Sequence, residues 1–291
     1  MAEQEKWDIE IKPKDKLFSV DFKELWNYRD LCSLFVKRNI ITQYKQTILG
    51  PVWFVVQPAL TVLMYMIVFG GIAGIPTDGV PRPLFYLAGT CMWNYFSECL
   101  TKTSNTFVSN SSIFGKVYFP RLVMPISDII SNLLRFAIQL GFFVIVYVVY
   151  FLVDPSCTAH LTWYALLFPL LILMMAGLAL GFGTIISSMT TKYRDLQVLF
   201  SFIVQLWMYA TPIVYPLSQT ASMRYFGIPV HKLMCLNPVT PIIETFKYGF
   251  LGAGDFVGWR WLIYSFVFMI VLLSAGIVVF NKVQKSFMDT V

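Results

Sequence analysis

The sequence predicts an all-α integral membrane protein with six transmembrane helices. Of its 291 residues, 57% are hydrophobic and only 13% are charged, whereas soluble domains carry about 25% charged residues. The mean hydropathy is +0.66. The apolar residues also gather in stretches that can supply the roughly 20 residues needed by a bilayer-spanning helix. Composition and clustering together place the chain in a membrane.

Four of the six expected spans enclose a long uncharged stretch, and the other two are interrupted by charges. The spans cover residues 51–74, 84–108, 127–153, 161–190, 196–214 and 259–281. The second contains Glu98 and Lys102, and the third contains Arg135. Counted from the intervening turn, Glu98 and Arg135 lie about equally far along their helices. We expect them to pair in an antiparallel hairpin, because an unpaired charge in a membrane is costly, although Lys102 competes for Glu98 from the next helical turn.

The distribution of Lys and Arg predicts that both termini lie in the cytoplasm. Fifteen of the 22 Lys and Arg residues fall in the segments that this orientation places inside, and five fall in the outer segments. An excess of positive charge is typical of cytoplasmic loops. The first residues lack the apolar core of a signal peptide. No basic face on a soluble domain is visible, so we expect no nucleic-acid partner.

Three connecting segments are expected to have structure of their own. In residues 22–47, apolar side chains recur at helical spacing among Arg29, Lys37 and Arg38, which is typical of an amphipathic helix in the membrane interface. This helix is either a docking surface for a cytoplasmic partner or a plain anchor. Residues 215–257 are apolar but broken by prolines, which predicts outer, re-entrant short helices. A short amphipathic helix at the cytoplasmic surface is predicted between spans two and three, from the run Ile113, Phe114, Lys116, Val117, Tyr118 and Phe119.

Motifs for nucleotide binding and catalysis are lacking from the sequence. It has no Gly-x-x-x-x-Gly-Lys-Ser/Thr loop, so we do not expect it to bind ATP through a P-loop. His160 and His231 are isolated, and we predict no metal site and no catalytic residue. The alternative class is a membrane-embedded enzyme that modifies a glycan lipid. Such an enzyme should carry clustered acids or histidines at one interface.

Three separated motifs resemble the permease subunits of type-2 ABC exporters of cell-surface polysaccharides. They are VKRNIITQYKQTILGPVWFVVQP (residues 36–58), KYRDLQVLFSFIVQLWMYATPIVYP (192–216) and LNPVTPIIETFKYGF (236–250). The motifs also occur in the family's order, and the resemblance runs from about residue 22 to the C-terminus. It implies an interface helix at 22–47 and a six-span permease domain at 48–291. The polar N-terminal extension, residues 1–21, lies outside it.

The resemblance implies a transport subunit and not an enzyme. In such systems the permease forms a homodimer in the inner membrane and carries two copies of an ABC ATPase subunit, which binds ATP and Mg²⁺. The implied cargo is a polysaccharide of the O-antigen type linked to undecaprenyl diphosphate. Exporters of teichoic acid or capsular polysaccharide share the pattern and remain alternatives. The interface helix and the short helix after span two, which the family uses as a coupling helix, would contact the ATPase.

Charged and aromatic residues complete the expected site. Arg194 and Asp195 would fix the cytoplasmic ends of spans four and five, or form a solvated turn. Aromatic rings stack on sugar faces without demanding fixed hydrogen bonds, so rings on spans one, two and five predict a conduit between two copies. The alternative is an interfacial belt that faces lipid. The rings are Trp53, Phe54, Tyr65, Trp93, Tyr95, Phe96, Phe202, Trp207, Tyr209 and Tyr215.

Overall fold

A computed structural model gives the fold of residues 22–45, 50–117, 119–155, 157–193, 195–225 and 227–286. This part of the chain is predominantly helical. Its longer helices are α2 (Arg29–Lys45), α3 (Trp53–Tyr65), α4 (Arg82–Ser104), α7 (Val123–Val153), α8 (Phe168–Thr190), α9 (Leu196–Tyr209), α11 (Thr240–Leu251) and α12 (Trp259–Ser286). The shorter elements are α1 (Phe22–Asn27), η1 (Gly50–Val52), η2 (Met66–Ile72), α5 (Thr106–Ser109), α6 (Ser111–Phe114), η3 (Trp163–Leu167), η4 (Leu217–Thr220), β1 (Arg224–Tyr225), β2 (Ile228–Pro229) and α10 (Val230–Leu236).

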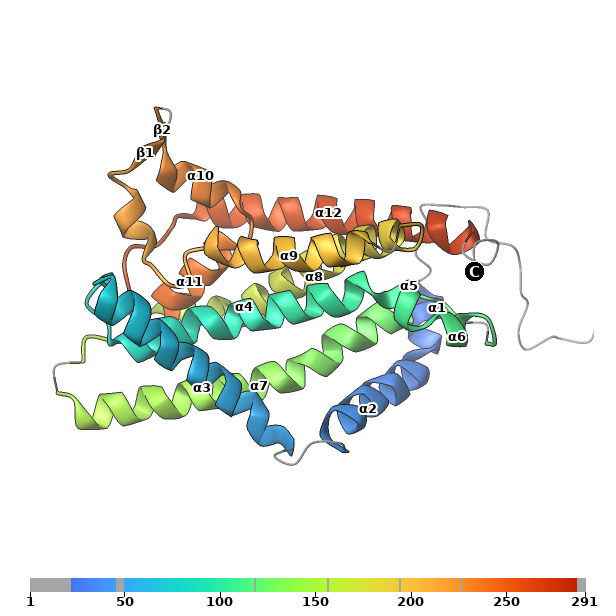
Figure 1. Cartoon of the computed structure of the whole chain (residues 1–291), viewed down its shortest axis with the longest axis horizontal. Coiled ribbons are helices and arrows are strands. Elements are labelled where there is room, and N and C mark those ends of the chain that lie inside the picture. Colours follow the sequence, from blue (N-terminus) through green and yellow to red (C-terminus); the bar gives the residue numbers. More distant parts are fainter. Residues whose placement is uncertain are drawn as a thin grey trace, which may run out of the picture.

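The long helices run along the length of the molecule, and the short elements gather at its two ends (Figure 1). One end holds α1, α5, α6 and the C-terminal turns of α12. The opposite end holds α10, α11 and the hairpin of β1 and β2, which pair antiparallel. Helix α4 is central, because it contacts α3, α7, α8, α9 and α11.

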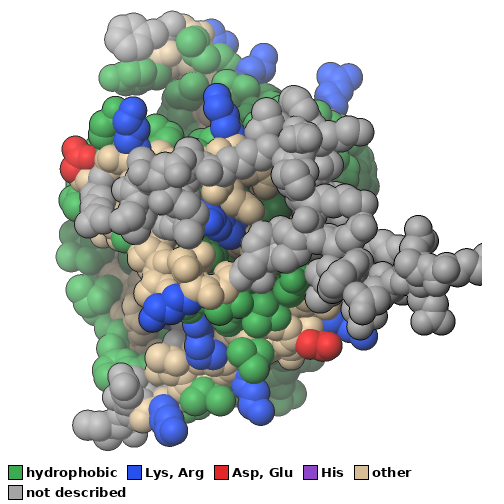
Figure 2. Space-filling view, turned by 90° about the vertical axis from the view of Figure 1, so that its right-hand side faces the viewer, with side chains coloured by type: hydrophobic (Ala, Val, Ile, Leu, Met, Phe, Trp, Pro, Cys, Tyr) green, Lys and Arg blue, Asp and Glu red, His purple; other side chains and the backbone are tan. Residues whose placement is uncertain are grey.

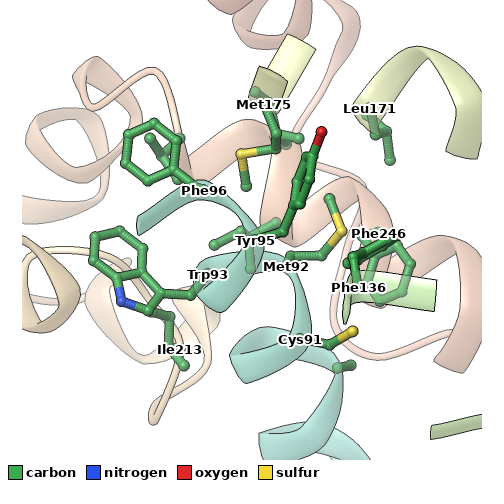
Figure 3. Close-up of a cluster of buried hydrophobic side chains, with 14 of the residues drawn as sticks. Cys91, Met92, Trp93, Tyr95, Phe96, Phe136, Leu171, Met175, Ile213 and Phe246 are labelled. Atoms are coloured by element: carbon green, nitrogen blue, oxygen red, sulfur yellow. The ribbon is translucent and has the colours of Figure 1, made fainter. Parts of the chain in front are cut away.

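Helix α4 is enclosed on all sides along most of its length. Five consecutive residues from Leu84 to Ala88 are buried, so no single face of this turn is left for solvent or lipid. Trp93 and Phe96 lie on one side of the helix, and Phe136 and Phe246 lie on the other (Figure 3). A helix that buries its whole circumference belongs to the core of a bundle. This helix therefore sets the positions of the others.

One end of the molecule is basic. Figure 2 views the end that carries α1, α5 and α6, and many Lys and Arg side chains are visible there beside few Asp or Glu. The exposed cations of the described chain at this end include Lys37, Arg38, Lys116 and Lys192. We call this surface the basic end. It corresponds to the side that the Lys and Arg distribution assigns to the cytoplasm.

The predicted interface helix is present as two helices. Helices α1 and α2 are separated by a turn at Tyr28, and α2 packs along α7. Asp30 lies in the first turn of α2, where the helix dipole favours an acid. Residues 1–21 and 46–49, including the last two of the predicted interface helix, lie outside the described residues.

Within the described ranges, four helical segments are long and apolar enough to cross a membrane: Gly50–Ile72, Val123–Val153, Trp163–Thr190 and Trp259–Gln284. The second expected span, α4, has 23 residues but carries Arg82, Glu98 and Lys102. The fifth, α9, has 14 residues and is about 21 Å long, which is less than the hydrocarbon thickness of about 30 Å. It ends at Tyr209 and not at residue 214 because Pro212 disfavours helical geometry at the residue before it.

The segment between α9 and α12 forms short elements, as its composition predicts. It contains η4, the two-residue strands β1 and β2, and the helices α10 and α11. Helix α11 is almost wholly buried against α4, α8, α12 and η3. It ends at Gly252, whose φ of 63° is a left-handed conformation that favours glycine. The motif at residues 236–250 therefore packs into the core of the bundle instead of forming an exposed loop.

Candidate functional site

Glu98 and Lys102 of α4 and Arg135 of α7 line a groove in the half of the molecule nearer the basic end. The groove has a volume of about 590 Å³ and lies between α4, α7 and α9. Its lining mixes charged, polar and aromatic side chains: Trp93, Ser97, Glu98, Thr101, Lys102, Arg135, Ser201, Val204, Gln205, Met208 and Tyr209. We call it the charged groove. Its size is that of a small-molecule binding site.

Glu98 and Arg135 form an ion pair at this groove. Arg135 Nη1 lies 2.6 Å from Glu98 Oε1, and the two side chains are 19% and 24% exposed. The same guanidinium donates from Nη2 to Oε1 of Gln57 at 3.3 Å and lies 4.7 Å from the ring centroid of Phe54. The pair therefore joins α4, α7 and α3. The antiparallel placement of α4 and α7 brings these residues together, as counting along the helices predicts.

Lys102 takes a different partner from the one considered in the sequence. Its ammonium donates to Oδ1 of Asn132 at 2.8 Å and makes no ion pair with Glu98 among the described contacts. Nearer the basic end, Asn39 of α2 donates to Oδ1 of Asp128 at 2.8 Å. Polar contacts thus follow α7 from α2 to the charged groove. The contacts with Arg135 and Asn132 allow Glu98 and Lys102 of α4 to remain inside the protein.

The ten aromatic residues expected along a conduit do not share one surface. Tyr65 and Trp207 face the interior of the chain: the Tyr65 hydroxyl lies 3.6 Å from Sδ of Met208, and Trp207 packs edge to face against Phe96 and Phe182 at 5.3 and 5.1 Å. Phe54, Trp93, Tyr95 and Phe96 are buried, and the Tyr215 hydroxyl donates to the carbonyl of Tyr209 at 3.0 Å. The exposed rings are Trp53, Phe202 and Tyr209.

Asn237 connects α9 to the segment that follows it. Its Oδ1 accepts the indole N–H of Trp207 at 3.0 Å, and its Nδ2 donates to Oγ1 of Thr211 at 2.9 Å. Both groups of one amide are therefore used to hold the end of α9 against the start of α11. This role has no signature in the sequence beyond an Asn-Pro pair that follows α10.

A second ion pair is enclosed near the opposite end. Glu244 and Lys247, one turn apart on α11, approach to 3.0 Å, and their side chains are 9% and 1% exposed. The Lys247 ammonium also donates to the carbonyl of Pro212 and lies 3.9 Å from the ring centroid of Phe85. Gly89 makes room for this lysine, because a Cβ there would lie 3.2 Å from Lys247 Cε. The acid and base at i and i+3 were visible in the sequence, but their burial was not predicted.

The residues expected to couple to an ATPase divide into buried and exposed groups. Phe114 and Phe119 are buried with Phe35 in a cluster that also includes Phe107 and Phe280. They hold the loop after α4 against α2 and α12, which corrects the expectation that their rings form an outward surface. Exposed side chains are those of Arg29, Lys37, Arg38, Lys116 and Val117, and Ile113 is partly buried. The predicted amphipathic helix is reduced to the four-residue α6.

Two further positions bear on this end of the molecule. Arg121 donates from Nη1 to the carbonyl of Gln284 at 2.8 Å, which ties the start of α7 to the end of α12. Burial lowers the pKa of the Arg121 guanidinium, although arginine keeps its charge in proteins. Asp195 precedes α9 and accepts the backbone N–H of Leu196 at 3.1 Å. Tyr118 and Arg194 lie outside the described residues.

Among the residues that the structure describes, no group of three or more His, Cys, Asp and Glu side chains is placed to hold a metal ion. The described chemistry is that of charge pairs, hydroxyls and aromatic rings around a groove. Such an arrangement suits binding and movement of a polar ligand within a bundle of apolar helices.

Comparison with known proteins gives a consistent result along most of the chain. The family described as ABC-2 type transporter matches residues 30–251. An O-antigen export system permease protein RfbA of Myxococcus xanthus is 28% identical over 228 residues, which are 77% of this chain and 82% of that protein. Two proteins of the same name from Klebsiella pneumoniae are 24% and 23% identical, each over 89% of this chain and 94% of its relative.

Proposed function

Because this chain belongs to the ABC-2 type transporter family, we propose that it is the membrane-spanning subunit of an ATP-driven exporter. Its cargo is a lipid-linked polysaccharide of the O-antigen type, which it moves across the inner membrane. The observation that carries this proposal is the similarity to three O-antigen export permeases, along 77% to 89% of this chain. The relatives are covered over 82% to 94% of their own length, so most of their architecture has a counterpart here.

In this proposal six helices cross the membrane and both termini lie in the cytoplasm. The six are α3 with η2, α4, α7, α8, α9 and α12. The charges of α4 are compatible with a span, since Glu98 pairs with Arg135 and Lys102 is hydrogen-bonded within the protein. The basic end supports the orientation, because positive charge gathers on the cytoplasmic side of membrane proteins. Helices α10 and α11 are then the outer re-entrant helices.

We further propose that two copies form a homodimer through α3 and α9. Most side chains of α9 are exposed in the single chain and none is buried, and the large apolar exposed ones include Leu199, Phe202 and Leu206. Leu60 and Met64 of α3 are likewise exposed. Polysaccharide would pass between the copies. The exposed rings Trp53, Phe202 and Tyr209 are suited to line that path, while Trp93, Tyr95 and Phe96 support α4 from within.

The basic end is the proposed docking surface for the ATPase subunits, one for each copy. It presents exposed cations from α2 together with Lys116 and the 58%-exposed Val117. The buried rings of Phe114 and Phe119 would connect this surface to α2 and α12. Movement of a docked ATPase could therefore reach the long helices through packed side chains. Hydrolysis of ATP takes place in the partner.

Co-purification tests the proposed function directly. The tagged chain, expressed with its neighbouring genes in a native host, should retain an ATPase subunit in one-to-one ratio. ATP hydrolysis by this complex should depend on the chain, and cells lacking the chain should keep completed glycan lipid inside. Wild-type surface polysaccharide in such cells, or a purified chain that transfers sugar by itself without any ATPase, would reject the proposal.

A further inference from the structure

We propose that the charged groove binds the phosphate-bearing headgroup of a lipid. The groove is defined by its lining from α4, α7 and α9 and by its volume of about 590 Å³. This inference deepens the proposed function and rests on it only for the identity of the lipid. The chemistry is that of a phosphate joined to a hydroxyl-bearing group and to an apolar tail. Each of these three parts has a counterpart in the groove.

The charge of the groove favours an anion. Its lining includes two cations, Lys102 and Arg135, but a single acid, Glu98, which pairs with the arginine. An ammonium has three donors, and the hydrogen bond described for Lys102 goes to the neutral amide of Asn132. Asp128, on the same side of α7, attracts Lys102 through its charge but accepts its hydrogen bond from Asn39 and is not part of the lining. One positive charge in the groove is therefore left without a bonded carboxylate.

The Arg135 guanidinium is incompletely satisfied. Its Nε is buried and has no hydrogen-bond partner in the described part of the chain. Its contact with Gln57 is a long one, at 3.3 Å, to a neutral acceptor. A phosphate oxygen is a stronger acceptor, because hydrogen bonds between a guanidinium and an anion are charge-assisted. A bound phosphate could thus take the place of the glutamine without breaking the pair with Glu98.

The hydroxyls of the groove are oriented to accept hydrogen bonds. Ser97 donates to the carbonyl of Asn94, Thr101 to that of Ser97, and Ser201 to that of Val198. Each hydroxyl oxygen then keeps lone pairs that face outward from its own helix. These oxygens suit a ligand that brings its own hydroxyl donors, such as a sugar or glycerol. The cations and the hydroxyls together match a phosphate with an alcohol group attached.

An apolar surface borders the groove. On α9, Ser201 and Gln205 line it, and the neighbouring side chains of Val198, Phe202 and Leu206 are exposed. This surface is apolar and exposed in the single chain, so an acyl or prenyl tail could lie along it while the headgroup occupies the groove. A free phosphate or nucleotide would leave that surface unused. For this reason we assign the groove to a lipid and not to a soluble anion.

Native mass spectrometry of the purified full-length chain in neutral detergent tests the assignment. The probes are phosphatidylglycerol, a polyprenyl phosphate, and dioleoylglycerol as a lipid without phosphate. We expect the wild type to retain both phosphate lipids over dioleoylglycerol, and Lys102→Gln to weaken that retention about tenfold, since a charge-assisted hydrogen bond is lost. The matched control is Lys192→Gln, which removes an exposed cation from the turn before α9 and should change nothing.

A second variant separates binding from folding. Ser201→Trp fills the groove from an exposed position on α9 and leaves Glu98, Lys102 and Arg135 in place. It should lose phosphate-lipid retention while it melts at the wild-type temperature. Preference for the polyprenyl phosphate, abolished in both variants, would identify the cargo carrier as the occupant. Equal retention of the two phosphate lipids, abolished in the same way, would identify bulk phospholipid.

Two results would overturn the assignment. One is equal retention of dioleoylglycerol and the phosphate lipids by the wild type. The other is unchanged retention in both Lys102→Gln and Ser201→Trp. The assay uses the permease chain alone, so either result leaves the ATPase co-purification untouched. Conversely, a chain that binds phosphate lipid but recruits no ATPase would keep this site and reject the transport function.

Discussion

Two acid–base pairs inside the described part of the chain differ in what surrounds them. Glu244 and Lys247 lie on one helix near the end opposite the basic end and are 9% and 1% exposed. Glu98 and Arg135 lie on two helices beside the charged groove and are 24% and 19% exposed. The first pair is enclosed by protein on every side. The second borders a space that a ligand can enter, so its groups can exchange partners.

This difference separates a structural pair from one suited to binding. The Lys247 ammonium has a carboxylate, a carbonyl and an aromatic face around it, which uses its capacity fully. The Arg135 guanidinium keeps a buried N–H without a partner in the described chain. Fully satisfied polar groups in a low-dielectric interior hold a single geometry. We therefore expect substitutions in the Glu244–Lys247 pair to affect folding, and substitutions near the charged groove to affect ligand binding more.

Removal of one member of the enclosed pair should have the largest effect. Lys247→Met leaves the Glu244 carboxylate buried without its partner, and breaking a buried pair in this way costs about 3–5 kcal/mol. We expect a large fall in yield and in melting temperature in detergent. The double variant Glu244→Gln with Lys247→Met removes both charges and should recover much of the loss. A single variant as stable as the wild type would show that the pair is not enclosed as described.

Removal of one member of the groove pair should cost less. Glu98→Gln leaves Arg135 with its neutral contact to Gln57, and an arginine without a counter-charge within a span costs about 2.5–3.5 kcal/mol. Glu98→Gln combined with Arg135→Gln should be more stable than Glu98→Gln alone. Unfolding of the three variants in detergent gives the comparison. Losses that simply add would argue against a coupled pair.

Loss of the Asn237 amide should have a smaller effect on stability than loss of either charge. Asn237→Ala leaves the indole N–H of Trp207 without its acceptor, which costs about 1–2 kcal/mol when the group is buried. It also frees the end of α9 from the start of α11. We expect lower stability together with faster proteolysis of residues 210–229. With Trp207→Phe already present, the same replacement should cost less, and an equal cost would contradict the shared hydrogen bond.

The Glu98–Arg135 pair was predictable from the sequence because helical rise is fixed at about 1.5 Å per residue. Counting back along two antiparallel helices from their turn gives the relative depth of Glu98 and Arg135. The positions of the long helices followed in the same way from runs of apolar residues. The ends of these helices were predicted less accurately. Helix α9, for example, stops before Pro212 and not at residue 214, because a proline disfavours helical geometry in the residue before it.

The Glu244–Lys247 pair and the packing of the aromatic rings were not predictable by the same means. Glu244 and Lys247 lie in a proline-broken segment that resembles an outer loop, and their burial depends on α4 and the end of α9, which are distant in sequence. The sequence around an aromatic residue likewise does not show which residues its ring packs against. Trp207 could have faced a conduit, lipid or Phe182, and three-dimensional packing alone places it against Phe182. The amphipathic pattern around Phe114 also does not show whether its apolar face packs against the same chain or against a partner subunit.

The smallest effect on stability should come from the basic end, which touches neither pair. Lys116 and Val117 are exposed, Val117 at 58%, so Lys116→Glu with Val117→Asp should change stability by no more than about 0.5 kcal/mol. If this surface docks the ATPase, the double variant should assemble and insert normally but lose most export, since it reverses a charge and removes an apolar contact.

Phe114→Asp is unsuitable here because that ring is buried in the cluster with Phe35, and its loss would disturb folding instead. Arg224→Glu, on the exposed strand β1 at the opposite end of the molecule, is the control for a change of net charge. Surface polysaccharide and ATPase activity of the reconstituted complex are the measurements. Full export by the double variant, with the ATPase still bound, would place the docking surface elsewhere on the basic end.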